Sequence, residues 1–437
     1  MSEGGELFAA VFAHGGTEIS ATAWLQAILD AEAALARALE RAGLAADGAG
    51  AAVTAVAKAS NFDLAELGRQ AARTGNPVPA LVRALHGMLP GPAAAAVHQG
   101  ATSQDIIDTA MMLLAKTALE VAGQSLSEAA AEAARLAAEH RDTVMPGRTL
   151  LQQAVPVTFG LVAAGWLTGL DESRRRLAAV RRDRLAVQFG GAAGTLAPLG
   201  PAGPRVAALL AGELGLAEPV LPWHTDRLRI TELAAALAGV CAAAGKIARD
   251  VTLLAQPEVG EVREGGSGGG SSTMPHKRNP VAAVAILGCT KQAPGLLATL
   301  TAAAEQEHQR AAGGWHAEWQ PLAALLRLTC SAASWCAELL AGLVVDRAAM
   351  RANLDAAGGL PMAERVAALL APKLGRPAAH DLVAKAAADG QSLADVLRGA
   401  GLTAGEIGAA LDPAGYLGAA GEFVDRALAA HASAGEP

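Results

Sequence analysis

Gly265-Gly-Ser-Gly-Gly-Gly-Ser-Ser-Thr-Met-Pro-His-Lys-Arg-Asn-Pro280 is the most informative segment of this 437-residue chain. Five of its first six residues are glycines, which leave the backbone free to turn and therefore predict a loop. Asn279 is a favoured N-cap residue and Pro280 suits a first helical turn, so a helix is expected to follow the loop. Lys277 would then lie beside a helix N-terminus, whose free N–H groups and partial positive charge favour a carboxylate or phosphate.

Ser271 and Ser272 lie on the glycine-rich side of this predicted anion site. A serine hydroxyl held near an ammonium group and amide donors in a dry pocket can exchange a proton with carbon. The glycine and serine content by itself would also fit a plain linker before a capped helix. The pattern Gly-Ser-Ser-x-Met-Pro-x-Lys-x-Asn, matched at every fixed position from Gly270 to Asn279, resembles instead the signature of the fumarase/aspartase superfamily.

The composition predicts an all-α protein. Apolar residues make up 52% of the chain and aromatic residues only 3%, and this alanine- and leucine-rich balance favours helices packed closely on small side chains. The spacing of proline and glycine predicts five long helices, over 104–141, 156–189, 226–256, 280–304 and 315–345. We expect three helical domains: an N-terminal domain over 1–98, a central bundle of the five long helices with the signature loops over 99–350, and a C-terminal domain over 351–437.

Charge and hydropathy argue against nucleic-acid and membrane partners. The net charge is −7, which disfavours binding to nucleic acid. The most apolar run, 233–245, lies between Glu232 and Lys246 and is shorter than the roughly 20 residues that span a bilayer. No Lys or Arg precedes Arg37, so the basic start of a signal peptide is lacking. We therefore expect a soluble cytoplasmic protein, and its four cysteines, which form no CxxC pair, are expected to be reduced core residues.

Two further polar clusters stand at the ends of the first long helix. They are His98-Gln-Gly-Ala-Thr-Ser-Gln-Asp105 and Gly147-Arg-Thr-Leu-Leu-Gln-Gln-Ala-Val-Pro156. Taken alone, the first fits a capping box of Thr102 with Asp105, and the second fits a turn between two helices. Both resemble the other two signature regions of the same superfamily, Thr-Ser-x-Asp and Thr-x-x-Gln-x-Ala-x-Pro, in the expected order. With three regions matched, the chain is identified as a member of the superfamily.

Helix length predicts that these clusters meet only across subunits. A helix over 104–141 is about 55 Å long at 1.5 Å per residue. The first cluster lies at its start and the second lies beyond its end, so one subunit cannot bring both into one pocket. We therefore expect a homo-oligomer whose helices form a larger bundle between subunits. The resemblance implies a homotetramer with active sites shared between subunits.

The resemblance also implies a reaction and a set of site residues. Members remove a proton next to a carboxylate and expel a group from the neighbouring carbon, or run the reverse addition, through an enediolate that needs fixed positive charge. The match to the motif makes Ser271 the catalytic acid/base. It assigns binding of a small polycarboxylate substrate to Lys277, Asn279, Ser272, Thr102, Ser103, Thr149, Gln152 and His98. His308 and Arg310 are possible further charge partners or simply members of a surface salt bridge, and no metal or organic cofactor is expected.

Leu150 departs from the superfamily pattern. Many members have at this position a histidine that assists the leaving group, and leucine cannot donate a proton. A carboxylate, whose unperturbed pKa is about 4, leaves or adds without such help. This change favours the branch of the superfamily that lactonises a carboxymuconate. Further stretches resemble that branch, namely 188–191, 222–225, 306–308, 315–319 and 353–355.

Three alternatives stay open from the sequence. A lyase that eliminates another stable anion from a substituted succinate, such as nitrite from nitrosuccinate to give fumarate, obeys the same logic. Adenylosuccinate or argininosuccinate cleavage fits less well, because Leu150 cannot assist a nitrogen leaving group. A helical scaffold without catalysis fits least, because Ser271, Lys277 and Asn279 are all retained.

Overall fold

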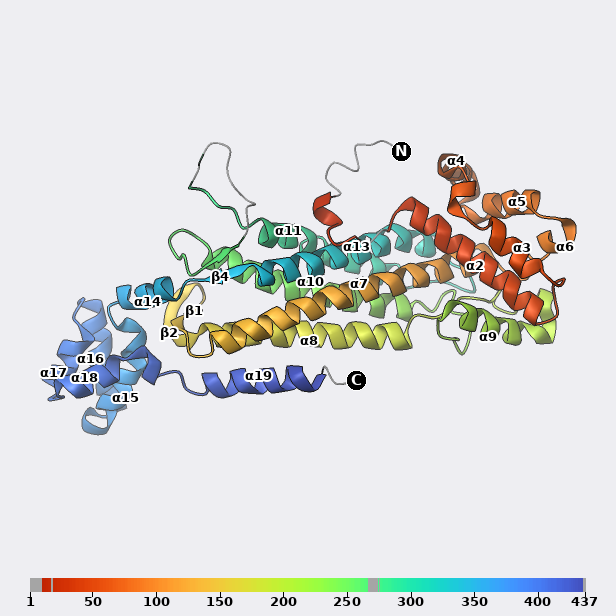
Figure 1. The fold of residues 1–437 in the computed structure, drawn as a ribbon. Helices are drawn as coiled ribbons and strands as arrows, with labels where there is room; N and C mark the ends of the chain where they lie inside the picture. The colour runs from red at the N-terminus through yellow and green to blue at the C-terminus, as the bar shows by residue number, and fades with distance from the viewer. Residues whose placement is uncertain (1–9, 17–18, 266–273, 275, 435–437) are drawn as a thin grey trace. The chain divides into compact units, whose positions relative to one another are not determined.

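The computed structural model describes residues 10–16, 19–265, 274 and 276–434, and within these ranges the chain is mainly helical (Figure 1). The β structure of the described residues amounts to two antiparallel two-stranded sheets and isolated bridges. The expected all-α class is thereby confirmed. Ser271 and Ser272 lie outside the described residues.

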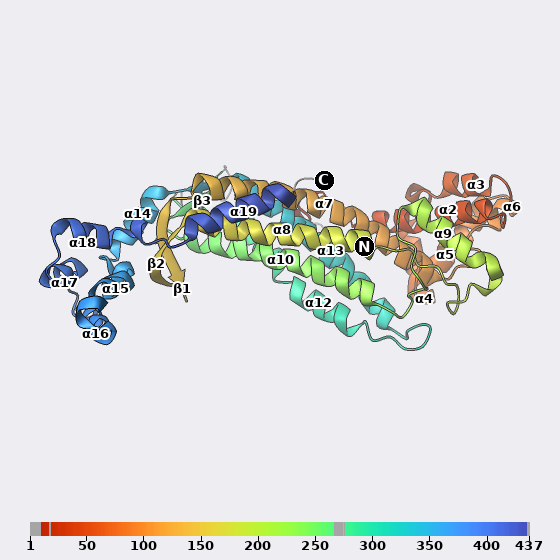
Figure 2. The same cartoon turned by 90° about the horizontal axis from the view of Figure 1, so that it is seen from below.

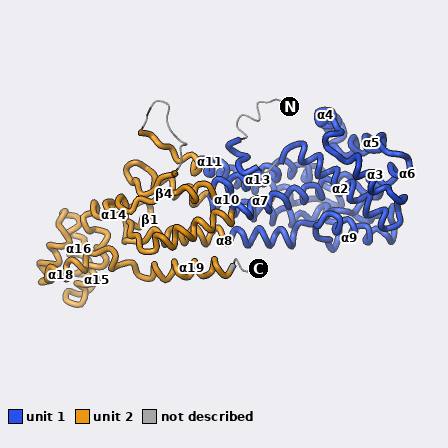
Figure 3. The backbone as a smooth tube through the Cα atoms, viewed as in Figure 1, with its two compact units in different colours: residues 1–125, 173–244, 285–335 blue, residues 126–172, 245–284, 336–437 orange. Residues whose placement is uncertain are grey.

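The chain divides into two compact units (Figure 3). Unit 1 comprises 1–125, 173–244 and 285–335, and unit 2 comprises 126–172, 245–284 and 336–437. These boundaries cut across the three domains expected from the sequence, which stay a prediction.

The N-terminal part of unit 1 is a group of short helices around α2 (Ala21–Arg41). These are α3 (Ala49–Val56), α4 (Leu64–Thr74), α5 (Val78–Met88) and α6 (Gly91–Ala94), with α9 (Gly203–Leu214) joining from later in the chain. Ser20 caps α2 by accepting a hydrogen bond from the backbone N–H of Ala23. Glu213 of α9 forms ion pairs with Arg37 and Arg41, at 2.7 and 2.8 Å, and these fasten α9 to α2.

Most of the long helices begin and end within a few residues of the predicted positions, but the second of them, α8, ends at Asp183 and not at 189. The long helices are α7 (Ser103–Glu139), α8 (Phe159–Asp183), α10 (Leu228–Leu254), α11 (Val281–Thr290), α12 (Ala293–Ala302) and α13 (Gly314–Ala341). The fourth expected element is thus made of two helices, because Pro294 lies at the first turn of α12 and has no N–H to continue the ladder of α11.

Within unit 1, segments of α7, α10 and α13 lie side by side (Figure 2). The thiol of Cys241 on α10 is 3.5 Å from Thr329 Oγ1 on α13, and Cys330 Sγ donates to the carbonyl of Ala118 on α7. All four cysteines are free and buried, as expected from the sequence. Alanine and cysteine at these contacts let the helices approach closely.

In unit 2, β1 (Val144–Thr149) and β2 (Gln152–Thr158) form a hairpin where the sequence predicted only a turn between helices. The pairing accommodates the prolines because Pro146 lies opposite Pro156, at positions that donate no ladder hydrogen bond. A bulge follows at Gly147, where a Cβ would lie 2.5 Å from the carbonyl oxygen of Val155. Helix α8 consequently begins at Phe159, three residues later than expected.

The remaining elements of unit 2 lie in the last third of the chain. They are β3 (Val262–Glu264), which pairs with β4 (Leu343–Val345), and the helices α14 (Arg347–Ala356), α15 (Ala363–Leu374), α16 (Arg376–Ala388), α17 (Leu393–Gly399), α18 (Ala404–Leu411) and α19 (Ala420–Ala434). Leucines and valines of α15 to α17, with Ile407 of α18, form a small separate core. Helix α19 then packs near α8, with His431 Nδ1 2.9 Å from an Asp171 carboxylate oxygen.

Three helical segments are long and apolar enough to cross a membrane by length and composition. They are Leu228–Leu254, Val281–Ala302 and Gly314–Ala341, with mean hydropathies of 1.5, 1.4 and 1.2. We expected no apolar segment as long as the roughly 20 residues that span a bilayer, and this expectation was wrong. Alanine keeps the mean hydropathy of the helix high beyond the run over 233–245. Two thirds of the most apolar window of Gly314–Ala341 is buried inside the protein.

Candidate functional site

The first polar cluster forms the start of α7. Ser103 is the first helical residue, and the backbone N–H of Thr102 donates to Asp105 Oδ2 at 2.9 Å. This is one half of the predicted capping box. The Thr102 hydroxyl instead accepts a hydrogen bond from Arg310 Nη1 at 3.1 Å, so the structure joins two residues that the sequence proposed separately.

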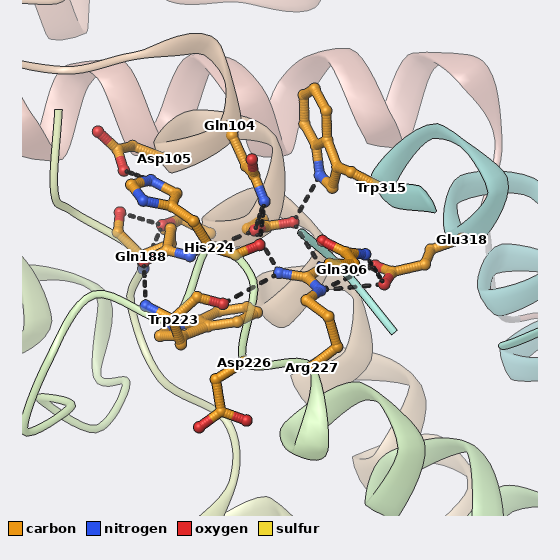
Figure 4. Close-up of polar contacts among 12 residues, drawn as sticks. Gln104, Asp105, Gln188, Trp223, His224, Asp226, Arg227, Gln306, Trp315 and Glu318 are labelled. Atoms are coloured by element: carbon orange, nitrogen blue, oxygen red, sulfur yellow. Dashed lines mark hydrogen bonds and ion pairs between the residues drawn. The ribbon is translucent and has the colours of Figure 1, made fainter. Parts of the chain in front are cut away.

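Asp105 makes the largest number of the contacts described for this cluster, and Figure 4 shows it beside His224. Besides Thr102 N–H, its fully buried carboxylate accepts the N–H groups of Gly190 and Gly191 at 3.0 and 2.9 Å. His224 Nε2 lies 2.7 Å from Asp105 Oδ1. One carboxylate thus holds three chain segments together, from α7, the loop at 190–191 and the loop before α10.

A second buried network adjoins the first (Figure 4). Arg227 contacts Asp108 Oδ2 at 2.8 Å and Glu318 Oε1 at 3.0 Å, and Trp315 Nε1 donates to Asp108 at 3.0 Å. Burial works to lower the pKa of Arg227, but the two carboxylates raise it, so the guanidinium stays charged. Burial raises the pKa of Glu318 despite that partner. This network supports the site by fixing α7, α10 and α13 within unit 1.

His98 is held in a strained conformation by a buried acid. Its φ is +59°, in the region that non-glycine residues rarely adopt. Glu32, which is fully buried on α2, accepts the His98 backbone N–H at 3.0 Å and lies 2.6 Å from His98 Nδ1. Burial opposes protonation, yet Glu32 and then Asp105 raise the pKa of His98 overall. This geometry favours an imidazolium that leaves Nε2 for an anionic ligand.

Arg310 and His308 differ in their placement. Arg310 is partly buried at the first cluster, and burial lowers the pKa of its guanidinium. His308 has an exposed side chain and a φ of +52°, and its carbonyl accepts the Thr225 hydroxyl at 2.9 Å. The contact with Thr102 favours the role of Arg310 at the site over a surface salt bridge.

The second polar cluster forms the tip of the β1–β2 hairpin. Thr149 and Gln152 are the last paired residues, so Leu150 and Leu151 make the connecting turn. Both leucines have positive φ, +51° and +64°, and both are exposed. The nearby Arg148 is paired with the fully buried Glu261 through contacts of 2.8 and 2.6 Å.

The third region is described from Met274 onward, apart from residue 275. Lys277 and Asn279 are exposed, and α11 begins at Val281. We expected the backbone N–H groups at this helix start to be free for an anionic ligand, and this was wrong for Ala282 and Ala283. Glu264 of β3 accepts the N–H groups of Ala282 and Ala283 at 3.1 and 2.9 Å, because the strand ends beside the helix start.

The described candidates thus fall into two groups. Unit 1 contains His98, Thr102, Ser103, His308 and Arg310, of which Thr102 and Arg310 are in direct contact. Unit 2 contains Thr149, Gln152, Lys277 and Asn279.

Two cavities flank the hairpin of unit 2. One, of about 360 Å³, is lined by Arg148, Leu151 and the Lys246–Asp250 ion pair, among others. The other, of about 490 Å³, contains Gln152 and Glu364. Gln152 and Leu151 therefore face different hollows beside the same turn.

Six acidic or imidazole groups in these contacts were missed from the sequence: Glu32, Asp108, His224, Glu261, Glu264 and Glu318. The signal for Glu32 was an acid with alanine on both sides, in the alanine- and leucine-rich sequence of α2. His224 lies in the stretch 222–225, which resembles the lactonising branch of the superfamily but gave no indication of a contact with Asp105. Glu261 and Glu264 carry no local signal, since their partners lie 113 and 18 residues away.

Among the described residues, no group of three or more His, Cys, Asp or Glu side chains is placed to hold a metal ion. The expectation of a reaction without metal or organic cofactor stays a prediction.

Two family models match the chain. One, described as "Lyase", matches residues 10–295, and a second, "Adenylosuccinate lyase C-terminus", matches residues 359–427. Together they cover most of both units.

Relatives and a solved structure match nearly the full length. A 3-carboxy-cis,cis-muconate cycloisomerase of Bradyrhizobium diazoefficiens is 47% identical over 92% of this chain and 93% of the relative. A nitrosuccinate lyase of Streptomyces davaonensis is 48% identical over 94% of this chain and 91% of the relative. The crystal structure of a 3-carboxy-cis,cis-muconate lactonizing enzyme from Pseudomonas putida superposes with a TM-score of 0.92 at 42% identity, covering 99% of this chain and 100% of the other.

Proposed function

We propose, from the premise that this chain belongs to the lyase family of the fumarase/aspartase superfamily, that it is a 3-carboxy-cis,cis-muconate cycloisomerase of aromatic-compound catabolism. The observation that carries this function is the full-length match, in sequence and in fold, to enzymes that lactonise this substrate. The leucine at the tip of the β1–β2 hairpin is compatible with it, because a carboxylate adds without the proton donor that expulsion of a strongly basic leaving group would need.

The reaction is an intramolecular addition. An oxygen of one substrate carboxylate bonds to a carbon of the conjugated double bond, and the π electrons move onto the adjacent carbon and its carboxylate. Fixed positive charge stabilises the resulting enediolate. Ser271 then delivers a proton to that carbon, giving a carboxymuconolactone, and regains a proton from solvent.

We assign the anion contacts to the residues carried over from the family motifs. Lys277 and Asn279 with Ser272 would hold the carboxylate that becomes the enediolate. Thr102, Ser103 and His98 would hold another, supported by the Glu32 contact that favours the charged form of His98. Thr149 and Gln152 would contact the third, and Arg310 joins Thr102 through its hydrogen bond.

The active enzyme is proposed to be a homotetramer with sites shared between subunits. Helix α7 has 37 residues and is therefore about 55 Å long, with Thr102 just before it and Thr149 after it. Two inactive variants, His98→Ala and Ser271→Ala, test this when mixed after partial unfolding and refolding. Recovered activity in the mixture is expected, and a fully active monomer in light scattering would refute the shared site.

The proposed location is the cytoplasm, and the proposed partner is the small polycarboxylate alone. The apolar helices include charged contacts that suit a water-soluble assembly, such as the bond from Trp166 Nε1 on α8 to Asp250 on α10. Neither nucleic acid nor membrane is proposed as a partner.

The assay follows the loss of conjugated-diene absorbance in 3-carboxy-cis,cis-muconate, with Ser271→Ala as control. We expect loss that depends on Ser271 and a lactone product. Unchanged absorbance with an intact oligomer would refute the cycloisomerase.

The relative at 48% identity supports one second candidate, elimination of nitrite from nitrosuccinate. Nitrite is a weak base and leaves without a proton donor, so Leu150 permits this reaction too. Fumarate release from nitrosuccinate, measured beside the diene assay, separates the two. The larger kcat/KM identifies the native reaction.

A further inference from the structure

The turn between β1 and β2 has an unusual composition for its geometry. Two-residue hairpin turns with positive φ at both central residues strongly favour Asn-Gly, Asp-Gly or Gly-Gly. Here both positions are leucines, Leu150 at +51° and Leu151 at +64°. A bulky side chain in this region is strained, and such strain persists where another requirement outweighs it.

Packing within the chain does not explain the two leucines. Leu150 is 97% exposed and Leu151 is 73% exposed, so neither side chain is part of the buried core. A comparison pair, Val220 and Leu221, is exposed to the same extent, 98% and 74%, but neither has positive φ. The strain is therefore a property of the hairpin turn and not of exposed apolar residues in general.

The turn also brings no unpaired cation to the site. Arg148 is the only basic residue in the hairpin 144–158, and both of its terminal nitrogens contact Glu261. Asn353 Nδ2 further donates to Glu261 Oε1 at 2.7 Å, which fixes that acid. What the tip presents is two apolar side chains between the neutral polar groups of Thr149 and Gln152.

We propose that Leu150 and Leu151 determine specificity by covering the hydrocarbon segment of the substrate between its carboxylates and excluding water from it. This inference rests on the proposed cycloisomerase function. In this proposal the flanking Thr149 contacts a carboxylate oxygen, and the two leucines lie against the carbon chain next to that carboxylate. The positive φ values set the direction of both Cα–Cβ bonds before substrate arrives.

Water exclusion decides which oxygen adds to the double bond. In lactonisation a substrate carboxylate oxygen forms the C–O bond, and one proton from the enzyme acid forms the C–H bond at the neighbouring carbon. If water enters, its oxygen forms the C–O bond, one of its protons passes to a base, and the same C–H bond forms. The lactone is an isomer of the protonated substrate, and the hydrated product is heavier than the lactone by one water molecule.

The test is the double variant Leu150→Asn/Leu151→Gly, with Val220→Asn/Leu221→Gly as the matched control. Asn-Gly suits the turn, so we expect the melting temperature to rise by about 2 °C. We expect kcat/KM for lactone formation to fall about tenfold or more, as for loss of an apolar substrate contact, and a hydrated product to form. In water enriched in oxygen-18, hydration places the label on the hydroxyl carbon, whereas later lactone hydrolysis places it in a carboxylate. The control should lower neither lactone yield nor kcat/KM.

Three results would overturn the inference. Full lactone formation by the double variant would show that the leucines do not shield substrate. A lower melting temperature with a dissociated oligomer would assign them to a subunit contact. Wild-type protein that forms no lactone would refute the proposed function itself, and this inference with it; the first two results leave that function standing.

Discussion

Replacing Asp105 by asparagine should destabilise the protein strongly, although the side chains have nearly the same shape. The Asp105 carboxylate is fully buried and accepts four hydrogen bonds, two at each oxygen. An asparagine amide can accept at only one end, so two of the four donors would face an NH₂ group. Each buried donor left unsatisfied costs about 1–3 kcal/mol. After relaxation of the loops we expect the free energy of unfolding to fall by about 3–4 kcal/mol.

Asp63→Asn is the matched control for this measurement. Asp63 also accepts two backbone N–H groups, from Ala65 and Glu66, but at an exposed helix N-cap. Asparagine serves as well as aspartate at an N-cap, so a change of only about a few tenths of a kcal/mol is expected. Urea unfolding followed by circular dichroism at one protein concentration, with the oligomeric state checked, compares the two. A loss for Asp105→Asn as small as that for Asp63→Asn would refute the view that this carboxylate holds the cluster together.

Three further predictions concern buried groups. Glu32 raises the pKa of His98 in the folded protein, so this pair should stabilise the protein fully below about pH 6.5. The stabilisation should be lost as the pH rises through the raised pKa of His98. The free energy of unfolding of His98→Gln should therefore differ from that of wild type more at about pH 6 than at about pH 9. Arg227→Ala leaves two buried carboxylates without their cation and should lower the free energy of unfolding by about 3–5 kcal/mol, measured by urea titration. Burial raises the pKa of Cys241 to about 11 and that of Cys336 to about 12, so a thiol reagent at about pH 8 should react with neither until urea unfolds the protein; fast reaction in the native state would contradict their burial.

The long helices were predictable because their signals are local. The stretch after Thr102 lacks proline up to Pro146 and contains one glycine, and the observed α7 differs from the prediction by one or two residues at each end. The β1–β2 hairpin was not predictable in the same way. A turn was expected within 147–156, but Leu150 and Leu151 are neither glycine nor asparagine and therefore gave no sign of a β-hairpin.

The sequence singled out candidate residues, whose roles stay a prediction, but it did not indicate their contacts. Thr102 came from a motif and Arg310 was only a possible charge partner, and nothing local indicates that residues 208 positions apart share a hydrogen bond. The same holds for Asp105 and His224, which are separated by 119 positions. Such pairs depend on the packing of helices, and periodicity in one segment contains no information about which neighbour it meets.

The contact of Glu264 with the start of α11 has a consequence for how the family can diversify. It fastens the end of β3 to the start of α11, so the scaffold holds the two flanks of the signature segment together. The entropy of closing a loop grows only slowly with its length, by about 0.6 kcal/mol for each doubling. Insertions and exchanges in this segment should therefore be tolerated by the fold. A graft of the corresponding loop from a relative with another substrate is then a way to alter chemistry while the helices stay unchanged.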